Sequence, residues 1–367
     1  MRFRAVVGVA AALVGVSGLS SSHGTLGLVW ARQAPQSMAG RPPLDIARVL
    51  AAKYPAQPIM SYIPALAWSG SFRLAVLTGE DRWREKPRAE MEAFLSGKTP
   101  AIAEPYRLTS LAGHLAFADA EQFDGNRAAG TLARKAALFI LPDQPGMDVR
   151  FATGWTDDMF MASALLSRLP GGTNTVPFSA TLAKLLTSYA TRLQRGDGLF
   201  IHSADGPHAW GRGNGFALLG VTEALTHLPA DWPDRPGVLA IYRKHVSALA
   251  THQSDDGSWR QVVDEPTSYR ELTVTAMTVA ALSRGVARGW IDRATYQPIV
   301  DRGWAAVAAR VMDDGTVRDV CSGTGSGPTK EYYLNRPVVN GADDRGGAMA
   351  LLAAIEVESL RRQRSGR

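Results

Sequence analysis

The chain has 367 residues, 46% of them hydrophobic and 20% charged, which suits one large globular domain or two ordinary ones. Its formal net charge is +6, but the basic residues are scattered, so we expect no nucleic-acid partner. A mild positive charge is compatible with an anionic sugar as ligand. The single cysteine, Cys321, excludes an intrachain disulfide and a CxxC metal site.

Residues 1–31 predict a secretory signal peptide. Arg2 and Arg4 precede the apolar run AVVGVAAALVGVSGLS, which is short for a membrane span, and Val29-Trp30-Ala31 offers a cleavage site. An N-terminal membrane anchor is the alternative interpretation. Residues 32–42 are expected to form a flexible leader, and no later segment approaches the ~18 uninterrupted apolar residues of a membrane span. We therefore expect a periplasmic or secreted bacterial protein, free of the membrane once the signal is removed.

Residues 43–363 predict a single domain that is helical almost throughout. Alanine and leucine dominate, and alternating β-branched runs are scarce. Periodicity and Gly/Pro punctuation predict about twelve helices, which start near residues 43, 59, 84, 106, 124, 156, 174, 212, 234, 271, 293 and 343. Every second start recurs after about 50 residues, and later after more, as in a repeated helical hairpin. Six hairpins can close into an all-α (α/α)6 barrel. An open solenoid is the alternative, but no polar capping repeat is visible.

Unusual polar and aromatic residues gather where the even-numbered helices begin. In a ring of hairpins these starts share one end, so one cup would receive Trp155, Asp157, His202, Trp210, Arg212, Tyr269, Glu271 and Tyr332. Helix N-termini around such a cup favour an anionic ligand. The glycines of WGRGNG are expected to let the backbone bend tightly, so that Trp210 and Arg212 face the cup.

Each of these residues also has a structural explanation. Asp157 and Asp158 could cap a helix, and His202 could be a hydrogen-bonded core histidine. The two tryptophans could belong to the core, and Arg212 could form an ion pair with Asp205 or Glu223. Repetition of the pattern at four separate helix starts favours a functional site.

Five segments, in this order, resemble glycoside hydrolase family 105 and the related family 88: GWTDDMFMASALL, GLFIH, WGRGNGF, SYRELTVTAM and VCSGTGSGPTKEYYLNRPVVNGADDRGGAMALLAAIE. The resemblance runs from about Pro58 to Glu358 and implies an unsaturated rhamnogalacturonyl or glucuronyl hydrolase with an (α/α)6 barrel. Such an enzyme would release a 4,5-unsaturated uronic acid from the non-reducing end of lyase-generated oligosaccharides of the pectin or rhamnogalacturonan type. It would do so by acid-catalysed hydration of the C4–C5 double bond, without a cofactor.

The resemblance also implies roles for individual residues. Asp157 matches the catalytic acid, whereas Asp158 lies about 100° further round the helix and is expected to point elsewhere. His202 matches a histidine near the unsaturated sugar. Arg212 would bind the uronate carboxylate, since a guanidinium suits bidentate recognition. Trp210 and Phe216 would offer faces to the sugar ring. Trp155, Tyr269, Glu271 and Tyr332 complete the expected substrate-binding set. No metal site is expected, because His202 and His208 are not spaced as helical ligands.

One departure from the family pattern concerns a second aspartate. Family members generally carry it at the start of an upstream inner helix, but residues 106–118 contain no acid. Glu104 and His114 are the nearest candidates for a helper. The partner expected is an anionic oligosaccharide. A non-hydrolytic sugar-binding barrel, or a hydrolase of intact glycosides, is the alternative function.

Overall fold

The computed structural model describes residues 34–144, 146–169, 171–172, 177–364 and 366. The predicted signal peptide, residues 1–31, lies outside the described residues, as do Arg32 and Gln33 of the predicted leader. The rest of the leader packs on the domain: Gln36 N donates to Asp313 Oδ1 at 3.0 Å, and Met38 N donates to Val311 O at 2.8 Å. Met38 is itself buried. The expectation of a flexible leader is therefore wrong for these residues, because a buried side chain and two hydrogen bonds hold them in place.

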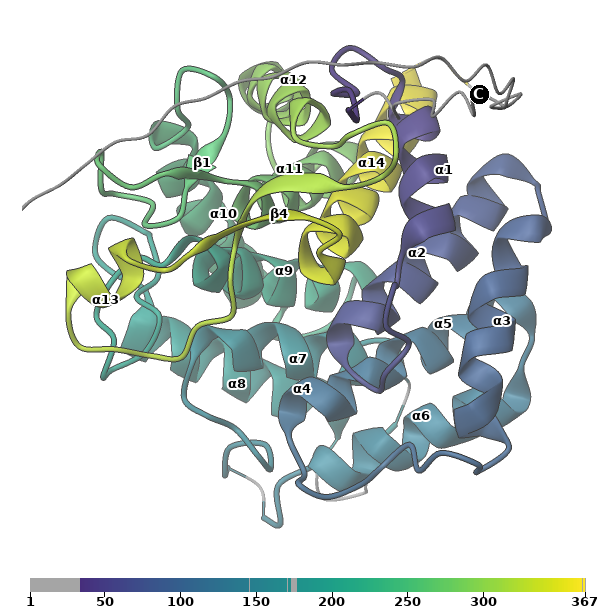
Figure 1. Ribbon diagram of the computed structural model, residues 1–367. Coiled ribbons are helices and arrows are strands. Elements are labelled where there is room, and N and C mark those ends of the chain that lie inside the picture. The colour runs from purple at the N-terminus through teal and green to yellow at the C-terminus, as the bar shows by residue number, and fades with distance from the viewer. Residues whose placement is uncertain (1–33, 145, 170, 173–176, 365, 367) are drawn as a thin grey trace, which may run out of the picture. The chain divides into compact units, whose positions relative to one another are not determined.

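Two layers of helices form the domain, residues 35–367 (Figure 1). The inner layer consists of α2 (Tyr62–Thr78), the segment α4 (Leu108–Leu111), η1 (Ala112–His114) and α5 (Leu115–Asp124), then α7 (Thr156–Leu166), α9 (Gly211–His227), α11 (Leu272–Ala287) and α14 (Asp344–Arg364). The outer layer consists of α1 (Pro43–Lys53), α3 (Arg82–Leu95), α6 (Arg127–Ile140), α8 (Phe178–Leu193), α10 (Arg235–Thr251) and α12 (Arg293–Ala309). Each inner helix contacts the next one, and α14 contacts α2, so the ring closes. The prediction of an (α/α)6 barrel is confirmed.

The two layers differ in how much of each helix is buried. Every residue of α11 from Leu272 to Val286 is buried, as expected for a helix covered on all sides. The outer helix α6 buries only one stripe, made of small and apolar residues at helical spacing: Ala129, Gly130, Ala133, Ala136, Ala137 and Ile140. Side-chain caps define the starts of two outer helices, α6 and α12; at α6, Asn126 Oδ1 accepts from Ala129 N at 3.0 Å.

The glycines at the start of α9 allow close packing. Gly211, Gly213 and Gly215 already lie within the helix and have no positive φ. A Cβ atom on Gly211 would lie 2.6 Å from Arg260 O, and one on Gly213 would lie 2.8 Å from Thr156 Oγ1. Further along, a Cβ on Gly220 would lie 2.3 Å from Met159 O. The expectation of a tight backbone bend is therefore wrong: these positions lack side chains because α9 approaches its neighbours so closely.

Short strands add two hairpins at the end where the inner helices begin. β1 (Trp259–Arg260) pairs antiparallel with β2 (Arg270–Glu271), and β3 (Val317–Cys321) pairs antiparallel with β4 (Val338–Gly341). Between β3 and β4 the chain makes an excursion, residues 322–337, that includes α13 (Lys330–Leu334); we call this excursion the strap. In Figure 1 the strap and its two strands lie in front of α9. None of the helices that the structure describes is long and apolar enough to cross a membrane.

Candidate functional site

An aspartate and a histidine meet at the end of the ring where the inner helices begin. Asp157 lies in the first turn of α7, and its Oδ2 is 3.2 Å from Nε2 of His202, which lies in the loop before α9. The imidazole lies between two indole rings, with its centroid 5.2 Å from that of Trp155 and 4.5 Å from that of Trp210. His202 is buried, while the Asp157 side chain keeps 18% of its surface exposed. The Asp157 carboxyl group is thus partly accessible to solvent, and the imidazole that it contacts is packed against two tryptophans.

The strap supplies a third member of this group. Tyr333 is buried, and its hydroxyl lies 2.9 Å from His202 Nδ1. Burial raises the pKa of Tyr333, so its phenol stays protonated at neutral pH. When that phenol donates to Nδ1, the imidazole proton resides on Nε2 and is donated to Asp157. The residue predicted from sequence is the neighbouring Tyr332, and two adjacent tyrosines carry no local information on which one faces inward.

Asp158 has the separate role expected from its position on the helix. Its carboxylate is buried and accepts hydrogen bonds from Thr153 N at 2.7 Å, Gly154 N at 2.8 Å and Tyr189 Oη at 2.7 Å. Burial raises the pKa of Asp158 to about 6. These contacts tie the start of α7 to the outer helix α8, so Asp158 is a structural residue.

Arg212 is a buried cation held by carbonyl groups. Its Nη1 donates to Cys321 O and its Nη2 to Ser322 O, both at 2.8 Å, and its guanidinium lies 4.8 Å from the Trp210 ring centroid. Among the described residues no carboxylate lies within ion-pair distance of it. Glu223, the other predicted ion-pair partner of Arg212, instead pairs with Arg168 and Arg284 at the opposite end of the ring. A buried guanidinium without a paired carboxylate favours binding of an anionic group from outside.

Tyr62 also lies at this end of the ring, although no sequence pattern indicated it. It is the first residue of α2, and its ring packs edge-on against Phe160 and Phe216, at centroid distances of 6.3 and 5.6 Å. Burial raises the pKa of Tyr62 to about 12, and the charges that act on its hydroxyl include those of Arg212 and Asp157. The hydroxyl is thus neutral at pH 7.

Four of the predicted substrate-binding residues have buried side-chain groups and make contacts within the protein next to the site. Phe216 is 1% exposed and stacks on Phe160, so its ring has no open face for a sugar; Trp210 is 2% exposed. Glu271 is buried and accepts from Val274 N at 2.8 Å and Cys321 N at 2.9 Å, which caps α11 and holds the end of β3. The Tyr269 hydroxyl is buried next to Cys321.

Tyr332 makes contacts within the strap, and a separate contact attaches the strap to the domain. The Tyr332 hydroxyl accepts from Gly325 N at 3.1 Å, and its ring lies 5.2 Å from that of Tyr333. Further along, the Pro328 carbonyl lies 3.0 Å from His208 Nε2. The strap is thus attached to the loop that carries His202.

Neither candidate for the second acid is brought to Asp157 by a contact in the described part of the chain. Glu104 is exposed in the loop before α4. His114 is buried, with Nδ1 2.8 Å from Leu111 O, and burial lowers its pKa to about 4, so it is neutral at pH 7. The next acid along the chain, Asp119, lies towards the other end of the ring, where it pairs with Arg168.

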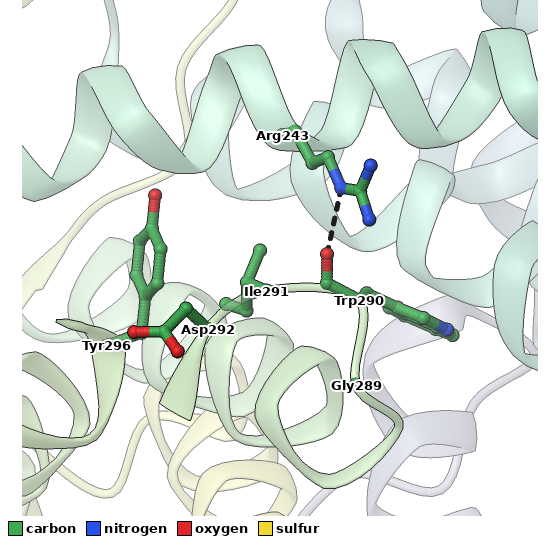
Figure 2. A pocket seen from close by; sticks show the side chains of 6 residues that line it. All are labelled: Arg243, Gly289, Trp290, Ile291, Asp292 and Tyr296. Carbon is green, nitrogen blue, oxygen red and sulfur yellow. Dashed lines mark hydrogen bonds between the residues drawn. The ribbon is translucent and has the colours of Figure 1, made fainter. Parts of the chain in front are cut away.

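A second pocket lies at that opposite end, between α10 and the loop from α11 to α12 (Figure 2). It has a volume of about 430 Å³, and Arg243 Nε closes one side by donating to Trp290 O at 2.9 Å. Trp290 is 6% exposed and so offers no open ring face for stacking. Within the described ranges, no group of three His, Cys, Asp or Glu side chains is placed to hold a metal ion.

Curated relatives match part of the chain. An unsaturated 3S-rhamnoglycuronyl hydrolase of Alteromonas sp. (strain LOR) is 31% identical over 128 residues, which cover 34% of this chain and 31% of that protein. An unsaturated rhamnogalacturonyl hydrolase of Bacillus subtilis (strain 168) is also 31% identical over 128 residues, 35% of each chain. The matched segment therefore spans about a third of the length of these relatives.

Comparisons of the whole domain agree with this likeness. A glycoside hydrolase of family 105 from C. acetobutylicum superposes with a TM-score of 0.74 at 18% identity, covering 85% of this chain and 99% of that one, which shows the shared fold. The family model for Glycosyl Hydrolase Family 88 matches residues 37–361, nearly all of the described domain. The chain therefore belongs to Glycosyl Hydrolase Family 88.

Proposed function

We propose that this protein removes a 4,5-unsaturated uronic acid from the non-reducing end of oligosaccharides that polysaccharide lyases leave behind. The observation that carries the proposal is that one end of the ring holds both an accessible carboxyl group, Asp157, and a buried cation, Arg212, that has no carboxylate partner in the described domain. An unsaturated uronate suits both groups: its carboxylate would bind the Arg212 guanidinium, and its sugar ring would lie against the Asp157 carboxyl group. The names of the relatives favour rhamnose as the sugar that is released.

In the proposed reaction Asp157 transfers a proton to C4 of the unsaturated ring, and water adds at C5. The carboxylate of Asp157 then takes a proton from that water, which restores the acid. The hemiketal formed at C5 opens, and the next sugar leaves. His202, held by Tyr333, orients the Asp157 carboxyl group through the contact at Nε2.

This route needs a single carboxyl group that donates and then accepts one proton. It therefore does not depend on a second acid at the upstream position, which this chain lacks. The other charged group required is Arg212, whose guanidinium can hold the uronate carboxylate throughout the reaction.

We further propose that the protein is periplasmic or secreted. The proposal is supported by the composition of residues 1–31 described above. Fractionation of cells that express the full chain, with N-terminal sequencing of the product, tests it. Retention of residues 1–31 on a membrane-bound product would favour an anchor instead.

The test of the activity uses the ultraviolet absorbance of the unsaturated uronate. The protein is mixed with lyase digests of rhamnogalacturonan, ulvan and glycosaminoglycan, and the absorbance is followed with time. We expect loss of absorbance and release of the next sugar, and neither with Asp157→Asn. Binding of the digest without turnover would favour a sugar-binding barrel, and cleavage of saturated oligosaccharides alone would favour a hydrolase of intact glycosides.

A further inference from the structure

The inner helices end around a polar cavity at the end of the ring opposite the cup. It has a volume of about 730 Å³, within the range of pockets that hold small organic ligands. Each of the six inner helices, or the segment directly after it, contributes to the lining. We call it the arginine cavity, after four of its lining residues: Arg73, Arg168, Arg284 and Arg288.

Three of these arginines are balanced by three carboxylates. Each carboxylate pairs with one or two of them: Asp119 with Arg168, Glu223 with Arg168 and Arg284, and Glu356 with Arg284 and Arg73. Glu223 also lies 3.4 Å from Nε2 of His227. These carboxylates are therefore already committed to cations of the cavity and leave none for a fourth.

Arg288 is that fourth cation, and it has no ion pair in the described domain. It directly follows α11, and its guanidinium carbon lies 5.9 Å from the centroid of the Trp290 ring, which Figure 2 shows. Arg235, also without an ion pair, lies 5.9 Å from the same ring. The negative end of a helix dipole favours a cation, but it amounts to only about half a unit charge. One helix end therefore does not balance two unpaired guanidinium groups.

The charges that act on Arg288 confirm this excess of cations. Burial lowers the pKa of Arg288, and the charges of Arg284, Arg235 and Arg73 lower it further, whereas the charge of Glu356 raises it. A shift in this direction means that positive neighbours disfavour the charged form of Arg288. An anion in the cavity would offset that repulsion.

Neutral hydrogen-bonding groups line another part of the cavity. The side-chain amides of Gln122 and Gln363 make no hydrogen bond to another described residue, and Thr226 and Ser359 contribute hydroxyl groups. Guanidinium groups recognise carboxylates and phosphates, while amides and hydroxyls can both donate to and accept from hydroxyl groups. The lining therefore fits an anion that also carries hydroxyl groups.

We propose that the arginine cavity binds a small hydroxylated anion, a sugar acid or a sugar phosphate, at a site separate from the cup. Arg288 would pair with the anionic group, and the amides and hydroxyls would bind the sugar hydroxyls. Both kinds of anion present the planar or trigonal set of oxygens that a guanidinium binds. A ligand there would contact several inner helices at once and would stabilise the folded ring.

The experiment measures binding of sodium glucuronate and of glucose 6-phosphate by titration calorimetry at constant ionic strength, with glucose as the neutral control. We expect at least one anion to bind and to raise the melting temperature, and glucose to do neither. The anion that binds more tightly identifies the source of the charge. Arg288→Gln should weaken this binding by about tenfold or more, and Arg288→Lys should weaken it less.

Two further variants separate the arginine cavity from the cup. Arg212→Lys alters the cup and should leave this binding unchanged. Arg318→Gln removes the charge of an exposed arginine of β3 and should also leave it unchanged, which controls for net charge. Because the measurement needs no turnover, its result does not depend on the proposed activity.

Three results would overturn the proposal. The first is that neither anion binds. The second is that Arg212→Lys abolishes the binding while Arg288→Gln does not, since the anion would then bind only in the cup. The third is a lower melting temperature in Arg288→Gln with unchanged binding, which would mean that Arg288 only stabilises the end of α11.

Discussion

Asp157 and Asp158 show how a single step along a helix separates two roles. A rotation of about 100° in the first turn of α7 directs one carboxyl group to His202 in the cup and the other to Tyr189 of α8. The first remains accessible, and the second is buried and accepts hydrogen bonds from two backbone N–H groups. Chemistry and structural support are therefore assigned to adjacent residues of the same type.

Substitution of each aspartate by asparagine should give opposite results. Asp157→Asn should lower kcat by on the order of 10²–10⁴ and leave the melting temperature nearly unchanged, because it removes only the general acid. Asp158→Asn should lower the free energy of unfolding by about 1–3 kcal/mol, because an amide cannot accept all the hydrogen bonds that the carboxylate accepts. Steady-state kinetics and thermal melts on both variants check this. An active Asp157→Asn, or an inactive Asp158→Asn of wild-type stability, would show that the roles are reversed.

Arg212→Lys keeps the positive charge but loses the planar fork of donors. We expect KM for an unsaturated uronate to rise by about tenfold or more, and Arg212→Ala to do worse. A methyl-esterified substrate should respond little to either change, because an ester cannot form the ionic pair. Kinetics on the acid and the ester, with a thermal melt beside them, make the comparison. Equal losses on both substrates, together with a lower melting temperature, would identify Arg212 as a structural residue only.

At the scale of elements, the contact between α7 and α9 determines how the cup is built. Glycines along α9 allow its backbone to lie against α7, which brings the start of α9, with Arg212, close to the start of α7, with Asp157. Gly220 is the tightest of these contacts, since its Cβ position is 2.3 Å from the backbone oxygen of Met159. A side chain at this position would require the two helices to separate.

Gly220→Ala should therefore lower the free energy of unfolding by about 1–3 kcal/mol or more, as overpacking against a backbone atom does. Gly237→Ala in the outer helix α10 is the matched control, since no atom lies within 4 Å of its Cβ position. The control should be neutral or should stabilise by about 0.5–1 kcal/mol, because alanine is a better helix former than glycine. Urea unfolding of the two variants measures the difference. Equal stability of the two would contradict the close-packing explanation.

On the scale of the whole molecule, ion pairs join all six hairpins at the end of the ring opposite the cup. Arg168 Nε donates to Asp119 Oδ1 at 2.9 Å, and Arg284 Nη1 donates to Glu223 Oε1 at 2.7 Å. The group is completed by pairs from Arg168 to Glu223 and from Arg284 and Arg73 to Glu356, so that α2, α5, α9, α11, α14 and the segment that follows α7 each contribute a charge. All of these side chains except that of Glu223 line a polar cavity of about 730 Å³, the arginine cavity.

Removal of one charge from this buried group should lower the free energy of unfolding. Glu223→Gln leaves Arg168 and Arg284 without the carboxylate that they share, and we expect a loss of about 3–5 kcal/mol in the free energy of unfolding. Asp81→Asn is the control, since Asp81 pairs with Arg84 and Arg88 but its side chain is 67% exposed; its loss should be much smaller than that of Glu223→Gln. Urea denaturation of both variants measures these values. A loss in Glu223→Gln no larger than that of the control would show that the group contributes little.

The same ion pairs should make the barrel sensitive to acid. Burial alone would raise the pKa of Glu356, but the charges of Arg284 and Arg73 lower it to about 2. In the unfolded chain this group has its ordinary pKa near 4.5, so the unfolded state binds the proton first. The stability that Glu356 contributes is therefore present above pH 4.5 and is lost as the pH falls towards 2. The urea midpoint measured from pH 7 to pH 3 should fall at the acid end, and less steeply in Glu356→Gln.

The order of the inner and outer helices could be read from the sequence alone, because hydrophobic periodicity and Gly/Pro punctuation are local signals. The short helix α13 and the division of one inner helix into α4, η1 and α5 could not. The predicted starts near 59 and 174 differ by only a few residues from those of α2 and α8. Asp157, His202 and Arg212 could be selected in the same way, since each precedes or opens an inner helix. The family resemblance then associated these residues with a particular chemistry.

Only the tertiary structure decided which side chains face the cup. Tyr333 meets His202 across 131 residues of chain, and Tyr62 meets Phe216 because the ring closes. Phe216, selected as a sugar platform, is instead covered by Tyr62 and Phe160. These outcomes depend on the rotation of each inner helix about its axis and on how closely its neighbours approach. Both are set by packing between segments far apart in the sequence, which no local pattern encodes.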